Sequence, residues 1–243
     1  MEFTYSNYKI LLKSIIDTGK YMDYSVVNNS IPNFIVLRHD IEFSLKKALI
    51  MSEIEKQFGI VSSYFIQIQN DFYNALSNES IKIIQQINAN NHYIGLHYHL
   101  SNKNSFDFSE ISNEIQRQCG VLSQFLNIPI TRFSIHKPTE QILKNTIKIK
   151  NIINTYDPLY FTYIPNFETK FENEINVKYY ADSSIKWKYG IPTKKNFEKF
   201  NRIQILIHPY SWYSSKKTYD EISELTIADR VKEIITIYEK EQK

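Results

Sequence analysis

The sequence predicts an α/β fold in which parallel strands alternate with crossover helices. Strand-length apolar runs rich in β-branched residues recur along the chain, and segments with helical apolar spacing separate them. The connections between strands are long enough to hold a helix, which favours a parallel sheet or barrel. The 243 residues contain no fixed-period repeat and no change of composition that marks a linker. We therefore expect a single domain over residues 1–243.

The composition excludes several classes of protein. Hydrophobic residues make up 42% and aromatic residues 14% of the chain, as in a globular protein. The net charge of +3 is too small to indicate a nucleic-acid or membrane-surface partner. The single Cys119 excludes an intramolecular disulfide and a cysteine-rich zinc site. The chain shows no secretory signal pattern and no apolar run near the roughly 18 residues of a membrane span, so we expect a soluble, cytoplasmic protein.

Six segments have the apolar spacing of a helix. The first ends before Gly19, the second follows Ser44, and the fourth begins with Ser109 and Glu110, which have capping character. In chain order, the expected helices cover residues 8–18, 45–58, 78–88, 108–125, 140–151 and 223–242.

Strands are expected where β-branched and aromatic residues cluster between turn signals. A Pro-Asn pair precedes the first strand, and Pro138 ends the fourth. In chain order, the expected strands cover residues 34–37, 60–68, 93–100, 129–138 and 203–209, with two further short apolar segments at 159–164 and 177–182.

The first strand leads into a cluster of ionisable side chains. Residues 34–37 are apolar, and Arg38, His39, Asp40 and Glu42 follow. In parallel sheets and barrels the functional site lies where strands end. If the chain stays extended, Asp40 and Glu42 point to one side, as a metal ligand and a neighbouring base would. Acidic residues are also favoured at the start of a helix, so this stretch alone leaves both interpretations open.

Histidines gather at the same kind of position. Five of the six sit at or just beyond the end of a strand-like run, namely His39, His97, His99, His136 and His208. In a parallel sheet these residues lie at one end, which points to a functional site. His97 and His99 are two apart and can face one side. Two histidines with one carboxylate are a common ligand set for catalytic zinc and for non-haem Fe(II). His39 points away from Asp40 in an extended strand, which predicts a structural or supporting role.

The order of these motifs resembles the polysaccharide deacetylase family, the NodB-homology carbohydrate esterases. The family's acidic strand end corresponds to residues 37–42. Asn91-His-Tyr-Ile-Gly-Leu-His97 is similar to the second motif, Gly-His-Glu-Ile-Gly followed by a metal-binding His. The later motifs are matched in the family's order by His136-Lys-Pro138, by Asp182 with Trp187, and by Leu206-Ile-His208. The resemblance covers about residues 34–209.

The resemblance implies a distorted (β/α) barrel of about seven parallel strands and a divalent metal, most often Zn²⁺. It implies hydrolysis of an N-acyl or O-acyl group on a sugar, with Asp40 as general base and His208 as general acid. Glu42 and His97 would be metal ligands. The family's second metal histidine usually follows the first by four residues, which is Ser101 here. His99 is the candidate replacement, and the sequence leaves open which of the two lies nearer the metal.

Substrate contacts are expected from the remaining motif residues and from nearby aromatic rings. The expected set is Arg38, Tyr98, His136, Lys137, Asp182, Trp187 and Tyr210. The expected substrate is a nucleotide-linked, lipid-linked or oligosaccharide acylated sugar, as an intracellular intermediate of surface-polysaccharide biosynthesis. Two alternatives stay open: a metal-independent amide hydrolase of the same fold, and a non-catalytic carbohydrate-binding protein.

Overall fold

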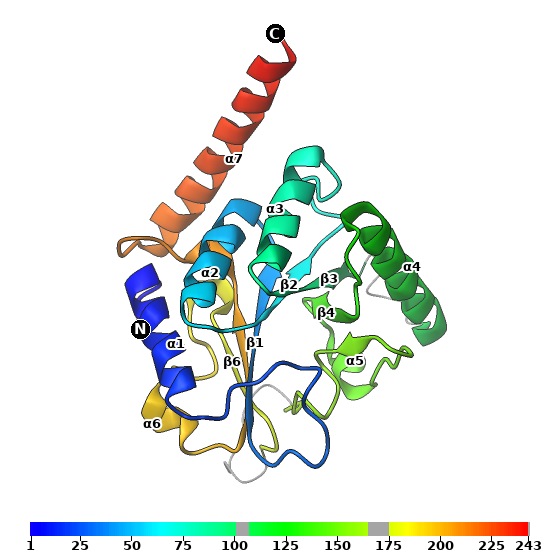
Figure 1. The fold of residues 1–243 in the computed structure, drawn as a ribbon, viewed down its shortest axis with the longest axis vertical. Coiled ribbons are helices and arrows are strands. Elements are labelled where there is room, and N and C mark those ends of the chain that lie inside the picture. Colours follow the sequence, from blue (N-terminus) through cyan, green and yellow to red (C-terminus); the bar gives the residue numbers. More distant parts are fainter. Residues whose placement is uncertain (101–106, 165–174, 243) are drawn as a thin grey trace.

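The structure, a computed structural model, describes residues 1–100, 107–164 and 175–242. Its centre is a seven-stranded sheet in which every pair of neighbouring strands is parallel. The strand order is β5-β4-β3-β2-β1-β7-β6, and the sheet curls into a half-barrel with helices packed on it (Figure 1). The prediction of a distorted (β/α) barrel with about seven parallel strands is confirmed.

The strands are β1 Phe34–Ile41, β2 Ser63–Ile66, β3 Tyr93–His99, β4 Arg132–His136, β5 Ile153–Asn154, β6 Lys178–Ala181 and β7 Arg202–Ile207. The α-helices are α1 Tyr5–Ile16, α2 Leu45–Gln57, α3 Asn78–Ala89, α4 Phe108–Leu126, α5 Glu140–Lys144, α6 Lys194–Phe197 and α7 Tyr219–Glu241. Two short 3-10 helices, η3 Ser183–Ile185 and η4 Pro209–Ser211, follow β6 and β7. Among the helices of the described ranges, none has both the length and the hydropathy of a membrane span.

β1 lies inside the sheet, between β2 and β7, and all eight of its residues are buried. Its apolar start is covered on both faces, as is usual for strands of parallel sheets. The strand then continues through Arg38, His39 and Asp40, which are also buried. Because buried charges are costly unless they are paired, each of these side chains needs a partner inside the protein.

His39 meets a buried carboxylate on the side of β1 that α2 covers. Its Nε2 lies 2.7 Å from Oε1 of Glu55 in α2. The hydroxyls of Tyr64 and Ser62 donate to Glu55 Oε2 at 2.7 and 2.5 Å, and the Tyr8 hydroxyl donates to Oε1. Glu55 is fully buried, so these bonds replace those it would make with water. The structural role predicted for His39 is confirmed, and the network ties α1, α2, β1 and β2 together.

A serine cap fixes the start of α2 and leaves the acidic residues before it free for another role. The Ser44 hydroxyl accepts a hydrogen bond from the Lys47 backbone N–H at 3.3 Å, which satisfies one of the unpaired donors of the first turn. Asp40 lies within β1, and Glu42 lies between the strand and the cap. Of the two interpretations that the sequence left open, the structure therefore favours converging carboxylates at the strand end.

The segment between β4 and β6 differs from the expected one. The helix expected over residues 140–151 ends at Lys144, because the backbone is already extended at Asn145, with φ −115° and ψ 107°. The chain turns again at Asn151, where φ is 64°, before the two-residue strand β5. The apolar segment at 159–164 forms no strand. There the Asp157 carboxylate accepts a hydrogen bond from the Leu159 backbone N–H at 3.0 Å and holds a turn.

Gly95 of β3 lets the second motif pack against its neighbouring strands. A Cβ atom at this position would lie 2.5 Å from ring carbons of Phe65 and 2.9 Å from Cγ of Arg132. Real Cβ contacts are not this short, so a larger residue at position 95 would displace Phe65 and Arg132, which pack beside this part of β3.

Candidate active site

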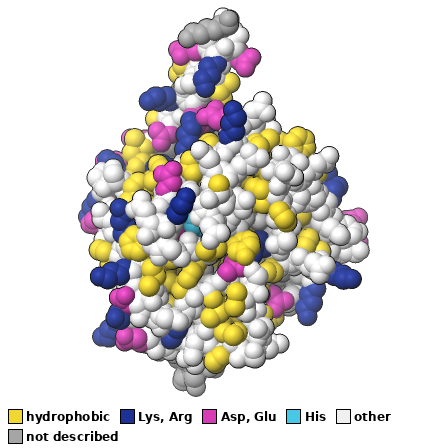
Figure 2. Space-filling model, in the orientation of Figure 1, with side chains coloured by type: hydrophobic (Ala, Val, Ile, Leu, Met, Phe, Trp, Pro, Cys, Tyr) yellow, Lys and Arg dark blue, Asp and Glu magenta, His cyan; other side chains and the backbone are white. Residues whose placement is uncertain are grey.

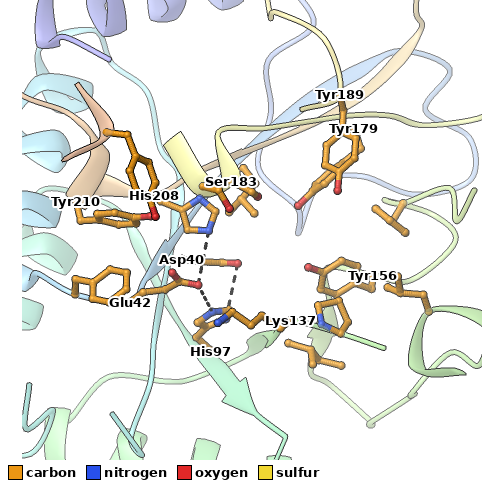
Figure 3. A pocket seen from close by; sticks show the side chains of 18 residues that line it. Asp40, Glu42, His97, Lys137, Tyr156, Tyr179, Ser183, Tyr189, His208 and Tyr210 are labelled. Carbon is orange, nitrogen blue, oxygen red and sulfur yellow. Dashed lines mark ion pairs between the residues drawn. The ribbon is translucent and has the colours of Figure 1, made fainter. Parts of the chain in front are cut away.

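The carboxyl ends of four strands bring the predicted site residues together. Asp40 comes from β1, His97 from β3, His136 from β4, and His208 directly follows β7. Asp40, His97 and His208 line a cavity of about 410 Å³ together with Glu42, and in it these four side chains point toward one another (Figure 3). His136 lies beside this lining, with its ring edge-on to His97. The cavity lining also includes Phe43, Lys137, Tyr156, Phe161, Tyr179, Ser183, Tyr189, Tyr210 and Tyr219.

Glu42, His97 and His136 form the set whose donor atoms converge most closely. His136 Nδ1 lies 3.0 Å from Glu42 Oε1 and 3.2 Å from His97 Nε2. One donor atom from each of the three residues lies within 4.8 Å of the other two, a spacing that fits ligands around one metal ion. Burial raises the pKa of the Glu42 carboxyl, but the neighbouring imidazoles of His136 and then His97 outweigh burial and hold it well below its usual range.

Ser134 sets which nitrogen of His97 faces this set. His97 Nδ1 lies 2.7 Å from the Ser134 hydroxyl, and that hydroxyl donates to Asp40 Oδ1 at 3.1 Å. A hydroxyl has one proton, so Ser134 must accept the hydrogen bond from His97 Nδ1–H. The Nε2 lone pair of the neutral ring then points toward Glu42 and His136, in the tautomer a metal ligand requires.

His99 lies next to the set without being part of it. The ring of His136 packs edge-on between His97 and His99, with centroid separations of 5.1 and 5.2 Å. His99 is the last residue of β3 and is exposed. The structure thus brings His136, which the sequence suggested as a substrate contact, into the position considered for His99. Ser101, the other candidate, lies outside the described residues.

Asp40 is paired with Arg38 on the same face of β1. Arg38 Nη2 lies 3.2 Å from Asp40 Oδ2, and both side chains are buried. Arg38 is held in turn by the hydroxyl of Tyr156, to which it donates at 2.8 Å, and by that of Thr155. Burial raises the pKa of the Asp40 carboxyl, but the ion pair with Arg38, aided by His97, lowers it by more. Asp40 is therefore a carboxylate at neutral pH, able to accept a proton.

His208 is held by Asp182. Its backbone N–H donates to Asp182 Oδ1 at 2.9 Å, and its Nδ1 lies 2.6 Å from the same oxygen. The Trp212 indole N–H donates to Oδ2 at 2.8 Å and fixes the carboxylate. Burial lowers the pKa of His208, but Asp182 and then Glu42 raise it by more, to about 9. A protonated His208 with its Nε2 3.9 Å from Glu42 Oε1 can act as an acid in the cavity.

The remaining predicted contact residues divide between the cavity and the core. Lys137 and Tyr210 line the cavity. Tyr98 is on the opposite face of β3 from His97 and packs in the hydrophobic core, because successive residues of a strand point to opposite faces. Trp187 stacks on Phe3 with ring centroids 5.9 Å apart, outside the cavity lining. Arg38 and Asp182 are buried and hold Asp40 and His208.

The sequence-based reasoning missed several residues of the site. Ser134 had a detectable signal, since it lies two residues before His136 on a strand and so faces the same side. Tyr156, Tyr179 and Tyr189 form one side of the cavity, facing the ionisable cluster (Figure 3). Tyr156 follows the two-residue strand β5, Tyr179 lies in the four-residue strand β6 and Tyr189 lies in a loop, and nothing distinguished them among the 18 tyrosines of the chain.

Comparisons with known proteins were made by sequence and by structure. No family model and no curated protein matches the sequence. A similar solved structure is the Xyl-CE4 domain of a multidomain xylanase from the hindgut metagenome of Trinervitermes trinervoides. It is 12% identical, with a TM-score of 0.44, over 83% of each chain. The family 4 carbohydrate esterase from Streptomyces lividans in complex with acetate is 12% identical, with a TM-score of 0.40, over 83% of this chain and 89% of that one.

A third similar structure is a CE4 family pseudoenzyme from Bacillus anthracis. It is 12% identical, with a TM-score of 0.43, and the match covers 85% of this chain and 63% of that one. These structural neighbours are family 4 carbohydrate esterases, the polysaccharide deacetylases that the motif order resembles.

Proposed function

We propose that this protein is a metal-dependent hydrolase that removes an N-acyl or O-acyl group from a sugar. The observation that carries the proposal is a Glu42–His97–His136 donor set, two members of which line the same cavity as the buried carboxylate of Asp40 and the paired His208. A carboxylate base and a histidine acid on either side of a metal site are the groups that metal-assisted hydrolysis of an acyl bond needs.

The residues present fit a divalent metal, most often zinc in such sites. Two imidazoles and one carboxylate are a common catalytic zinc set, and the Ser134 contact leaves His97 Nε2 unprotonated. When bound, such an ion lowers the pKa of a coordinated water and polarises the acyl oxygen. Glu42, His97 and His136 would hold it.

Asp40 is the proposed general base. Its Oδ2 is held by Arg38 and its Oδ1 by the Ser134 hydroxyl, so the carboxylate has a fixed orientation at the cavity wall. The ion pair keeps it deprotonated, and it takes the proton from the attacking water. Fixing the base in advance removes part of the reorganisation that the reaction would otherwise require.

His208 is the proposed general acid. Asp182 accepts the hydrogen bond from Nδ1–H, so the proton to be given up is the one on Nε2. It is transferred to the leaving nitrogen or oxygen of the sugar when the acyl bond breaks. The backbone and the ring of His208 are both bonded to Asp182, so the ring cannot rotate away from the cavity.

The cavity walls suit a sugar. Tyr156, Tyr179 and Tyr189 form one side and Tyr210 another, with the ionisable cluster between them (Figure 3). Phe43 also lines the cavity and packs edge-on against Tyr210, with ring centroids 4.5 Å apart. Aromatic rings offer flat apolar faces to the C–H face of a sugar, and their hydroxyls can bond its oxygens. We propose a nucleotide-linked, lipid-linked or oligosaccharide acylated sugar as substrate, acting as an intracellular intermediate of surface-polysaccharide biosynthesis.

The decisive experiment is metal analysis combined with an acyl-release assay. We expect about one zinc per chain in the wild type. His97→Ala and His136→Ala should lose it, while the neighbouring His99→Ala should retain it. Acylated sugars should then release free acid with the wild type and not with Asp40→Asn, which should keep its metal.

Two outcomes would contradict this proposal. Failure to bind zinc at neutral pH, even when zinc is added, would exclude the metal-assisted mechanism and leave a metal-independent hydrolase. The second is a protein that turns over no acylated sugar and whose sugar affinity is the same in the wild type and in Asp40→Asn. That result would identify a carbohydrate-binding protein.

A further inference from the structure

The C-terminal helix α7 is mostly unsupported by the rest of the protein. It extends from Tyr219 to Glu241, and Ile222 is its one buried residue. In the ribbon view it leads away from the sheet and the other helices, and its far end stands clear of the body in the space-filling view (Figures 1 and 2). All residues from 234 to 242 are exposed.

This exposed part of α7 carries large apolar side chains. Ile227 is 58% exposed, Ile234 51% and Tyr238 65%. Val231, Ile235 and Ile237 are also exposed. Soluble monomers rarely leave a contiguous apolar patch of more than a few hundred Å² open to water, and larger patches mark interaction surfaces.

The local sequence gives a second reason to expect a partner. Residues 234–237 read Ile-Ile-Thr-Ile, and all four are β-branched. β-branched residues are weaker helix formers than alanine or leucine, because the helix restricts their χ1 rotation. Most helical stability in proteins comes from packing of an apolar face. A helix with this sequence is therefore best explained by a surface that covers it.

The apolar residues form one stripe. Ile227, Val231, Ile234 and Tyr238 are spaced four, three and four residues apart, which is the spacing of paired helices. The stripe, called here the 227–238 stripe, faces away from the side on which Glu233 pairs with Lys46 of α2 at 3.1 Å. It is thus free to contact another molecule while α7 keeps its contacts with the body.

We propose that the 227–238 stripe binds the same stripe of a second copy of this chain, with the two α7 helices antiparallel. A two-fold axis between Val231 and Ile234 would place Ile227 against Tyr238 of the partner subunit, and Val231 against Ile234 of the partner subunit. Each large side chain then meets a large side chain, and the interface is self-complementary, as two-fold symmetry requires.

The charges of α7 favour this partner and this direction. From Tyr219 to Asp229 the helix has four acidic residues and no basic one, whereas from Arg230 to Gln242 it has three of each. A parallel pair would bring the two acidic halves together, and an antiparallel pair separates them. A membrane surface is a poorer partner, because helices that bind anionic lipid carry lysine and arginine on their polar face.

The oligomeric state tests the proposal. Sedimentation equilibrium of the full chain should show a reversible dimer. Val231→Asp combined with Ile234→Asp places like charges opposite each other across the two-fold axis and should raise the dimer dissociation constant on the order of a hundredfold. Thr236→Lys is the matched control: Thr236 is exposed on another side of α7, and dimerisation should be unchanged. Circular dichroism checks that the variants stay folded.

Cross-linking tests the direction of pairing. Cys119 is buried, and burial raises the pKa of its thiol to about 12, so it does not compete with introduced cysteines. The double variant Ile227→Cys with Tyr238→Cys should form a disulfide-linked dimer on mild oxidation. Each single variant should remain monomeric on a non-reducing gel.

Three results would overturn the proposal. The first is a wild type that stays monomeric at all concentrations. The second is a dimer that the stripe variant leaves intact. The third is efficient cross-linking of each single cysteine variant to itself, which would show a parallel pair.

Discussion

Arg38 and Asp40 form a buried ion pair from the same face of one strand, with Nη2 3.2 Å from Oδ2. β1 thus supplies its own cation two residues before the proposed base. His136 is available to the donor set with Glu42 and His97.

The first prediction concerns this pair. Arg38→Met should raise the pKa of Asp40, because burial is then no longer opposed by the guanidinium. The carboxylate form would be lost at a higher pH, so the acid limb of the kcat/KM profile should move up by about one to two pH units. Arg38→Lys keeps the charge and should move the limb less. A lower plateau with an unmoved acid limb would mean that Arg38 acts only through packing.

The second prediction concerns Ser134. Ser134→Ala removes the acceptor for His97 Nδ1–H and the donor to Asp40. Supporting contacts of this kind are worth about 10- to 100-fold in metal affinity, so zinc should bind more weakly by that factor in competition with a chelating dye. The control is Ser183→Ala. Ser183 lines the cavity, and its substitution should leave zinc affinity unchanged. Equal zinc affinity in Ser134→Ala and the wild type would refute the tautomer argument.

The third prediction concerns Asp182. The pKa of His208 is about 9 although burial lowers it, because Asp182 and Glu42 raise it by more. Asp182→Asn removes the charge, so the pKa of His208 should fall and its proton should be lost at lower pH. The alkaline limb of the kcat/KM profile should therefore move down. Trp212→Phe removes the indole hydrogen bond to Asp182 but leaves the Asp182 charge in place, so it should move the limb less. An unmoved alkaline limb in Asp182→Asn would exclude His208 as the acid.

The features that local sequence determines could be predicted. The alternation of strand-like apolar runs with segments of helical spacing predicted the parallel sheet. Because successive residues of a strand point to opposite faces, the sequence also predicted that His39 lies on the opposite side of β1 from Asp40. The positions of histidines after apolar runs placed His97, His136 and His208 at one edge. These inferences use residue spacing along each strand and the common direction of parallel strands, and they do not require knowing which strands pair.

Relationships between strands could not be predicted. Pairing of β3 with β4 sets His97 beside Ser134 and His99 beside His136, and this register decides which imidazoles converge. Tyr156 reaches Arg38 because a two-residue strand ends just before it, and a strand that short has no sequence signal. Trp187 was expected at the site, but the loop after β6 carries its ring to Phe3.

The last prediction concerns the Glu55 network, which stabilises the fold away from the cavity. Glu55→Gln replaces one of the two carboxylate oxygens with an NH₂ group, which cannot accept a hydrogen bond. At least one of the partners Tyr8, His39 and Tyr64 therefore loses its acceptor in the interior. Breaking a buried charged hydrogen-bond network typically costs about 3–5 kcal/mol. The measurement is the free energy of unfolding in urea at neutral pH, with metal binding as the control for an intact cavity.

The pH dependence of this variant separates the charge of Glu55 from its shape. Burial raises the pKa of Glu55, but His39 and the other donors lower it by more, to about 2. A depressed pKa stabilises the folded state above the unfolded pKa of about 4.3, and this contribution is lost as the pH falls toward 2. Its size is on the order of 3 kcal/mol. The difference in stability between wild type and Glu55→Gln should therefore shrink as the pH falls from about 5 toward 2. A difference that stays the same down to pH 3 would mean that the carboxylate charge contributes nothing and that the variant is destabilised by its lost hydrogen bonds alone.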